Sequence, residues 1–250
     1  RRISLTDAGR RYYQHCRRIL ADIAAAEEEV SALQQAVSGR LRAGVLSTFG
    51  RVVVVPRLRP FLERYPKLSL ELELTDRPLN VVKEGLDLAI QLNEPVVDPS
   101  LVARRLAVNE RIICASPDYL ARRGVPETPE ELRSHNCLTL YSMSRLNDWD
   151  FRDAAGSRIV RVSGSFHANT ADALYQAALA GIGLARLSTW LVADDIRAGR
   201  LYRVLPEYTH TDSAYSVFYP QGRYQSPKVR AFVDYLLELF TPAPPWERDV

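Results

Sequence analysis

The sequence of 250 residues contains few cysteines and histidines and no long apolar run. Its three cysteines, Cys16, Cys114 and Cys137, are odd in number and far apart, which favours free thiols in a reducing compartment over a disulfide framework. No apolar stretch approaches the ~18 residues that a membrane-spanning helix needs. The first residues also lack the apolar segment of a signal peptide. We therefore expect a cytoplasmic protein with no membrane partner.

The motifs of common enzyme classes are missing as well. There is no Gly-rich phosphate loop and no G-x-S-x-G elbow, and "GIG" at 181–183 follows a predicted helix instead of opening a dinucleotide-binding one. The four histidines are scattered, and His135 and Cys137 lack the spacing and the further ligands of a metal site. We expect no catalysis, metal or cofactor, with a Cys137–His135 hydrolase as the alternative.

The net charge of +3 is small, but its distribution is uneven. Six arginines fall in the first eighteen residues against one acid, Asp7, whereas Glu27, Glu28 and Glu29 follow later. A helix dipole favours the opposite order by about 0.3–1 kcal/mol per terminal charge. A neighbouring polyanion such as DNA would explain the arrangement. The alternative is a solvated charged face.

A heptad pattern follows in the same stretch. Apolar or small residues recur at steps of four and three residues until Gly39, which indicates one long helix with a narrow stripe that suits a second helix. We expect this seam to pair protomers in a homodimer or homotetramer; the alternative is a helix packed along its own domain. The seam residues expected to dimerise are Tyr12, Cys16, Ile19, Ile23, Val30, Leu33 and Val37.

The opening "RRISLTDAGRRYY" resembles the end of the winged helix-turn-helix of LysR-type transcriptional regulators. In that family an Arg-rich wing runs into an L-T-x-A-G turn and then a linker helix, and Leu5, Thr6, Ala8 and Gly9 match this turn. The resemblance implies that residues 1–9 are a remnant of the DNA-binding domain, without its two groove-reading helices, and that 10–38 form the linker and dimerisation helix. Thr6 suits the N-cap. The expected DNA-contacting residues are Arg1, Arg2, Thr6, Arg10 and Arg11.

Beyond Gly39 the pattern alternates between strands and helices, which predicts mostly parallel sheets covered by helices. The predicted strands are 41–47, 68–74, 86–92, 137–141, 149–152, 159–162, 182–187 and 214–220. The predicted helices are 48–66, 79–85, 116–124, 127–135, 169–181, 188–199 and 226–240.

Long stretches of this region, including "CASPDYLARRGVPETPEELRSHNCL" and "NTADALYQAALAGIGLARLSTWLVADDIRAGRL", resemble the effector-binding half of LysR-type regulators. The resemblance implies two doubly wound α/β lobes of the periplasmic-binding-protein type, crossed twice by the chain. Lobe I is expected at 39–113 and 216–240 and lobe II at 114–215, within an effector-binding domain of 39–240 and before a flexible tail at 241–250. A periplasmic solute-binding protein is the alternative, and it leaves the basic heptad helix unexplained.

Ligands of open α/β sheets bind beyond the carboxyl ends of strands, near helix N-termini. Two such places carry polar residues, Ser47-Thr48 and Asn169-Thr170, and on the expected fold they face each other across the cleft. We expect them to bind an effector carboxylate; the alternative is that they only cap their helices. The other effector-contact candidates are Asp76, Arg77, Gln91, Leu92, Met143, His167 and Arg186.

Two of these candidates have alternatives of their own. His167 is either a hydrogen-bonded structural residue or a switch. Arg186 interrupts an apolar strand, so it needs either an internal acid or a ligand anion as partner. Three positions depart from the family pattern: Gln91 replaces a common Arg, Asn80 an Asp and Ser188 a Pro. The first departure weakens the expectation of a cation beside lobe I. The sequence thus predicts a regulator that responds to a small anionic effector.

Overall fold

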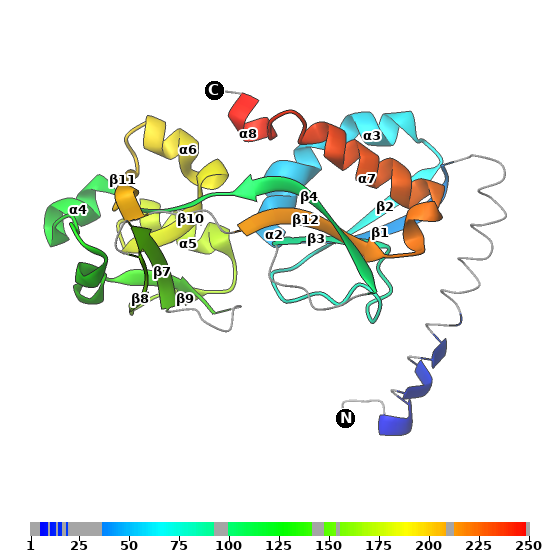
Figure 1. The fold of residues 1–250 in the computed structure, drawn as a ribbon, viewed down its shortest axis with the longest axis horizontal. Helices are drawn as coiled ribbons and strands as arrows, with labels where there is room; N and C mark the ends of the chain where they lie inside the picture. Colours follow the sequence, from blue (N-terminus) through cyan, green and yellow to red (C-terminus); the bar gives the residue numbers. More distant parts are fainter. Residues whose placement is uncertain are drawn as a thin grey trace. The chain divides into compact units, whose positions relative to one another are not determined.

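The computed structural model describes residues 6–9, 11–13, 15, 16, 19, 37–92, 100–141, 148–153, 156–208 and 213–248. The chain divides into two compact units (Figure 1). Unit 1 contains residues 1–107 and 215–250, and unit 2 contains 108–214. The crossings therefore lie at 107–108 and 214–215, where the sequence had suggested 113–114 and 215–216. The first differs because a strand that the sequence did not reveal, Leu101–Asn109, runs through the crossing.

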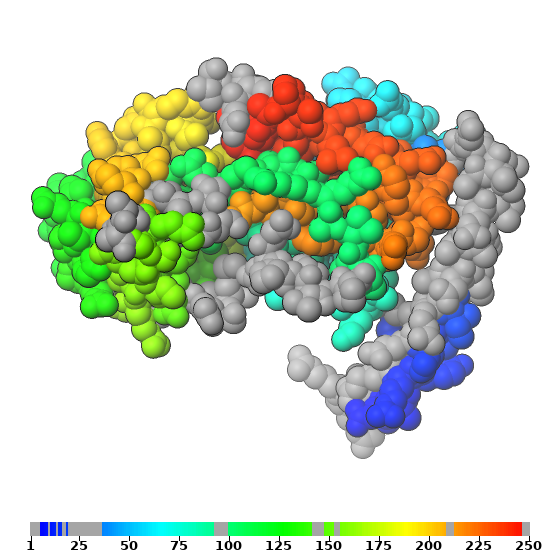
Figure 2. All heavy atoms as spheres, viewed as in Figure 1, coloured from blue at the N-terminus to red at the C-terminus, as the bar shows by residue number. Residues whose placement is uncertain are grey.

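Unit 1 contains a five-stranded sheet in the order β2-β1-β3-β12-β4. Strand β1 is parallel to β2 and β3, as expected, whereas β12 is antiparallel to β3, so the sheet is mixed. Strand β4 is an edge strand, and its side chains form a band across the visible face of unit 1 (Figure 2). The strands are β1 (Gly39–Val45), β2 (Leu68–Leu74), β3 (Leu88–Leu92), β4 (Leu101–Asn109) and β12 (Ser213–Pro220).

The helix predicted at 48–66 is broken into four pieces. They are α2 (Ser47–Phe49), a π-helical turn η1 (Gly50–Val54), a 3-10 turn η2 (Val55–Arg57) and α3 (Arg59–Arg64). Pro56 has no N–H for an α-helical hydrogen bond, so a regular ladder cannot pass through it. Arg57 instead donates from Nη1 to the carbonyl of Val53 at 3.0 Å. The prediction of one continuous α-helix at 48–66 was therefore wrong, because the regular hydrogen-bond pattern is interrupted near Pro56.

The segment 79–85 was also predicted as a helix, but it is a hydrogen-bonded turn. The Asn80 side chain accepts from the N–H of Lys83 at 2.8 Å, and Glu84 accepts from the N–H of Asn80 at 3.0 Å. Gly85 then adopts a φ of 63°, which ends the turn before β3. Local side-chain bonds of this kind compete with the helical ladder.

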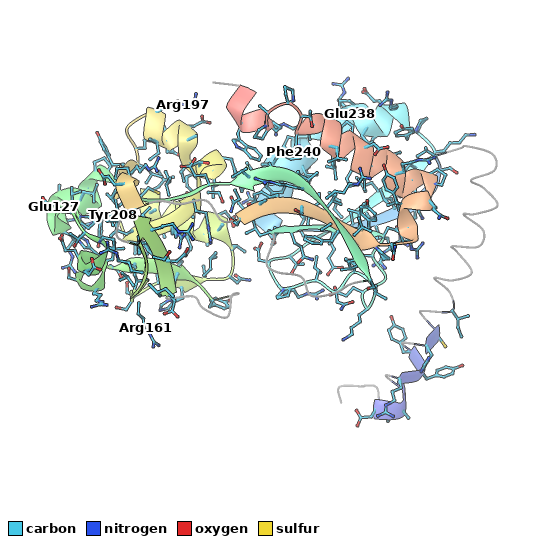
Figure 3. The ribbon with its side chains drawn as sticks, in the orientation of Figure 1. Glu127, Arg161, Arg197, Tyr208, Glu238 and Phe240 are labelled. Carbon is cyan, nitrogen blue, oxygen red and sulfur yellow. The ribbon has the colours of Figure 1, made fainter. Side chains whose placement is uncertain are left out.

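The C-terminal part of unit 1 consists of α7 (Pro227–Leu239) and α8 (Pro245–Arg248). A flexible tail was expected at 241–250, but Pro245 is buried and the Trp246 ring lies edge-on to Phe49 and Phe240. The centroid distances are 6.2 Å to Phe49 and 5.8 Å to Phe240, the latter labelled in Figure 3. These ring contacts attach α8 to the core of unit 1.

Unit 2 contains a second mixed sheet, in the order β11-β5-β10-β6-β9, and a hairpin of β7 and β8. Strand β10 is parallel to β6 and antiparallel to β5, and β6 is parallel to β9. The strands are β5 (Arg111–Ala115), β6 (Cys137–Leu140), β7 (Asp148–Asp153), β8 (Gly156–Arg161), β9 (His167–Ala168), β10 (Leu184–Ser188) and β11 (Tyr202–Val204). Of these, β5, β9 and β11 were not predicted.

Different elements cover the two faces of this sheet. Residues of α5 (Ala171–Leu179) and α6 (Thr189–Arg197) pack on one face with Leu138 and Ala185. The hairpin and α4 (Pro117–Arg123) pack on the other face with Cys137 and Leu184. The predicted helix 127–135 is a 3-10 helix, Pro129–Ser134.

Candidate functional site

The carboxyl ends of three parallel strands meet at one edge of unit 1. Val45 at the end of β1 is paired with Leu74 of β2 and with Ile90 of β3. The last residues of these strands and the residues that follow them are therefore neighbours at this edge. They include the predicted Ser47, Thr48, Asp76, Arg77, Gln91 and Leu92, so the sequence placed these six candidates at a common edge.

An internal carboxylate occupies the first helix N-terminus at this edge. Oδ1 of Asp76 accepts a hydrogen bond from the N–H of Ser47 at 3.0 Å. We expected this N–H to be available to a ligand, whereas Asp76 already binds it. Thr48 was expected to cap the helix, but the N-cap position is Leu46 and Thr48 lies buried inside α2. A negative charge at a helix N-terminus stabilises it, which accounts for Asp76.

The charged and amide candidates of unit 1 also have internal partners. Arg77 donates to Glu84 at 2.6 and 2.9 Å and to Glu73 at 2.6 Å. The hydrogen bond to Glu84, the largest cause, raises the pKa of the exposed Arg77 further. Gln91 donates from Nε2 to the carbonyl of Leu79 at 3.3 Å. At this edge the carboxylates of Glu73 and Glu84 therefore offset the positive charge of Arg77.

Unit 2 brings four predicted residues to the carboxyl edge of its own sheet. His167 and Ala168 form β9, Asn169 and Thr170 follow it, and Arg186 lies near the end of the parallel strand β10. Thr170 is at the N-cap position of α5, as predicted, although its side chain makes no capping hydrogen bond. Asn169 and His167 are exposed.

Three polar side chains lie in one row across neighbouring strands of this sheet. Thr139 of β6 is paired with His167 of β9, and Arg186 comes directly after the pair of Ala185 with Leu138. The Thr139 hydroxyl is 2.6 Å from Nδ1 of His167. Residues in register project to the same face of a sheet. His167 is thus a hydrogen-bonded residue of the fold, and Thr139, a polar residue within "CLTLY", is a neighbour that sequence reasoning missed.

Arg186 has an internal acid as its partner. Its Nη1 donates to Oδ1 of Asp150 on β7 at 2.6 Å. The Arg186 side chain is 13% exposed and that of Asp150 45% exposed. Arg186 lies on the hairpin-covered face because Leu184, two residues earlier, packs there with Trp149. Of the two partners considered for Arg186, the structure contains the acid; nothing in the sequence pointed to Asp150.

The described residues do not show an activated cysteine. Burial raises the pKa of the Cys137 thiol to about 12 and, with Asp195, that of Cys114 to about 12. Burial also lowers the pKa of His135, whose Nδ1 lies 3.2 Å from the Tyr119 hydroxyl. A neutral thiol is a poor nucleophile, so this arrangement does not favour the Cys137–His135 hydrolase.

Several predicted residues lie outside the described part of the chain. These are Arg1, Arg2, Arg10, Ile23, Val30, Leu33 and Met143. In the basic segment, Thr6 accepts from the N–H of Gly9 at 3.0 Å, which confirms it as an N-cap, and residues 7–9 and 11–13 are helical. Of the predicted seam, Tyr12 and Ile19 are exposed, while Cys16 and Val37 are partly buried.

The described residues contain neither a metal cluster nor a membrane-spanning helix. Among them, no group of three or more His, Cys, Asp or Glu side chains is arranged to hold a metal ion. Likewise, no helix in this part of the chain has the length and apolar character needed to cross a membrane.

The two α/β units define a substrate-binding domain. Residues 34–241 match the family model of the LysR substrate binding domain. The HTH-type transcriptional regulator DmlR of Escherichia coli K12 is 35% identical over 241 residues, which cover 96% of this chain and 78% of that protein. The HTH-type transcriptional activator TtdR of Escherichia coli K12 is 32% identical, covering 94% and 76%. The chain belongs to the family of LysR-type transcriptional regulators.

Solved structures show the same fold. CrgA, a LysR-type transcriptional regulator from Neisseria meningitidis, matches with a TM-score of 0.75 and 32% identity, covering 96% of this chain and 82% of that one. The full-length virulence activator AphB of Vibrio cholerae matches with a TM-score of 0.75 and 26% identity, covering 95% and 81%. These relatives favour a transcriptional regulator over a solute-binding protein.

Proposed function

We propose that this chain senses a small anionic effector and passes the response to DNA-contacting segments of the same regulator. The effector binds polar residues at the carboxyl ends of the strands, and its binding shifts the conformational equilibrium of the regulator. The observation that carries this proposal is the convergence of His167, Asn169, Thr170 and Arg186 at one edge of unit 2. Family membership supports the same role.

The DNA contacts are proposed for the basic segment. Arg1 and Arg2 contact phosphates or the minor groove, and Arg10 and Arg11 add backbone contacts beside Thr6. The Thr6 cap supports this arrangement because it begins a helix at the arginines. In a regulator carrying this chain, Arg10→Gln with Arg11→Gln should weaken binding to all DNA sequences alike and reduce the salt dependence. A loss confined to one sequence would contradict a backbone role.

The long helix is proposed to pair protomers in a cytoplasmic homodimer or homotetramer. Tyr12 and Ile19, both on the predicted seam, are 74% and 57% exposed in the single chain. A partner helix would bury them and would space two DNA-reading domains over two half-sites. Effector binding would then reposition the paired helices through the oligomer.

A thermal-shift screen against small organic acids tests the sensing role. A ligand at 100 times its dissociation constant adds about 2.7 kcal/mol to the stability of the folded state, which is measurable. Asn169→Ala and Thr170→Ala should each reduce the shift relative to the same variant without ligand, because both residues lie at the start of α5. Gln221→Ala, at an exposed residue directly after β12, is the control. A ligand whose shift is unchanged by Asn169→Ala and Thr170→Ala would place the effector elsewhere.

A further inference from the structure

The cation at the edge of unit 2 lies in apolar surroundings. Arg186 follows Leu184 and Ala185 and precedes Leu187, all three fully or almost fully buried. A guanidinium in such a strand is stable only with a partner that offsets its charge. The structure supplies that partner in Asp150, at 2.6 Å. Any anion that replaced Asp150 would have to satisfy the same guanidinium.

The Asp150 carboxylate can separate from Arg186 and become hydrated. Its side chain is 45% exposed, so its carboxylate can regain water when the ion pair opens. The hairpin around it is anchored independently, because Trp149 and Phe151 on either side are buried in the core of unit 2. Because the Arg186 side chain is only 13% exposed, opening the pair is favourable only when another anion takes the place of Asp150. The exchange would leave the hairpin folded, since its anchoring residues are not part of the pair.

An incoming carboxylate would find polar groups beside Arg186. Thr139 lies on the adjacent strand and His167 on the next, and neighbouring strands are about 4.8 Å apart. A short organic acid can thus place one carboxylate at Arg186 and a second polar group near the exposed ring of His167. A contact to His167 would add to the affinity that the carboxylate gains at Arg186.

We propose that Arg186 is the carboxylate-binding residue of the effector site and that Asp150 occupies it until an effector carboxylate replaces it. This inference rests on the proposed sensing function and adds to it the ligand class and a competing internal acid. Asp150 then sets effector affinity: each binding event must break the Arg186–Asp150 pair first. The internal acid and the ligand anion are successive partners of one guanidinium.

Binding of succinate, measured by calorimetry on the full chain, tests the exchange, with the neutral succinamide as the matched probe. Asp150→Asn should tighten succinate binding by about two- to five-fold, the range that a half-exposed ion pair supports, and leave succinamide unchanged. Arg186→Gln should abolish succinate binding whether or not Asp150 is present. Asp148→Asn is the control, because Asp148 is an exposed acid on the same strand, paired with Arg161 of β8, which Figure 3 labels.

Each outcome decides the proposal. Equal succinate affinity in wild type and Asp150→Asn overturns the exchange, and absence of succinate binding in both overturns the carboxylate site. Neither result bears on the sensing function. The thermal-shift screen and the Asn169→Ala variant test that function separately. If Asp150→Asn fails to fold, the side-chain Nε–H resonance of Arg186 in the wild-type protein serves instead. That resonance should shift with succinate and not with succinamide.

Discussion

Tyr175 on α5 donates a 2.5 Å hydrogen bond to Oδ2 of Asp195 on α6. The other carboxylate oxygen of Asp195 accepts from Nε of Arg200 at 2.5 Å, and its backbone carbonyl accepts from the N–H groups of Arg200 and Leu201. Asp195 itself is buried. One carboxylate therefore ties together the two helices on one face of the unit 2 sheet and the loop that leads to β11.

The first prediction concerns the pH dependence of this link. Burial, and then the hydrogen bond to Asp195, raise the pKa of Tyr175 to about 12. The folded state thus holds this proton more tightly than the unfolded chain, whose tyrosine pKa is about 10. The stabilisation is complete below about pH 10 and is lost as pH rises through about 12. Tyr175→Phe should remove this part of the alkaline loss of unfolding free energy.

Urea unfolding between pH 8 and about 12 measures the effect, by the difference between wild type and variant. The buried thiols Cys114 and Cys137, whose pKa values are about 12, contribute to the alkaline loss in both proteins and cancel in the difference. Tyr141→Phe, at an exposed ring, is the control. Parallel pH profiles for wild type and Tyr175→Phe would refute the proposed role of the hydrogen bond.

The second prediction concerns a close approach of two backbones in unit 2. A Cβ at Gly183 would lie 2.2 Å from the carbonyl oxygen of Asn136. That oxygen accepts from the N–H of Leu184 at 2.9 Å, so it cannot move without breaking the link between β10 and β6. Gly183→Ala should lower the unfolding free energy by about 1–3 kcal/mol or more. Gly222→Ala is the matched control, because no atom lies within 4 Å of its Cβ position and its φ is −77°.

Chemical unfolding of both alanine variants separates the steric effect from the general effect of replacing glycine. An alanine at Gly222 should be neutral or slightly stabilising, since it restricts the unfolded chain. Equal stability of the two variants would mean that the strands at Gly183 can separate freely.

The third prediction concerns the C-terminal segment. Trp246→Ala removes a ring that contacts Phe49 and Phe240. Because Trp246 is only partly buried, we expect a loss of about 1–3 kcal/mol, less than for a fully buried aromatic. Trp246→Phe should retain most of the stability. A loss of similar size from Trp246→Phe, or none from Trp246→Ala, would show that ring packing does not hold α8 in place.

The fourth prediction concerns the heptad seam. Ile23→Lys with Val30→Lys puts two charges at seam positions and should abolish association through this helix, because an unpaired charge is costly in an apolar interface. Ala24→Lys with Ser31→Lys adds the same charge one residue away from the seam and should leave association intact. Sedimentation velocity distinguishes the two variants. Unchanged association of the seam variant would mean that these residues pack elsewhere.

Strongly periodic segments could be predicted from sequence. Helices α5 and α7 and strand β2 appear close to where their apolar patterns placed them. Strand β4 escaped notice because "LVARRLAVN" has two arginines in its middle and no regular alternation. The helix at 48–66 failed because its apolar pattern continues through Pro56, although its hydrogen bonds cannot.

The candidate site, like the fold, could be predicted only in part from the sequence. The rule that ligands bind at carboxyl strand ends predicts from the sequence alone that His167, Asn169 and Arg186 lie at one sheet edge. It could not show that Asp150 pairs with Arg186 or that Asp76 binds the N–H of Ser47. Both contacts depend on how loops and hairpins pack, which the spacing of residues along the chain does not encode.

The burial of two cysteines makes the third a selective chemical handle. Cys114 and Cys137 are buried with pKa values of about 12, so maleimide reagents near neutral pH react slowly with either. Cys16 is partly exposed and lies on the predicted seam. In the separated chain, a spin label or fluorophore therefore attaches at Cys16 first, without removal of any native cysteine. Distances between two such labels would report directly on how the long helices of two protomers approach one another.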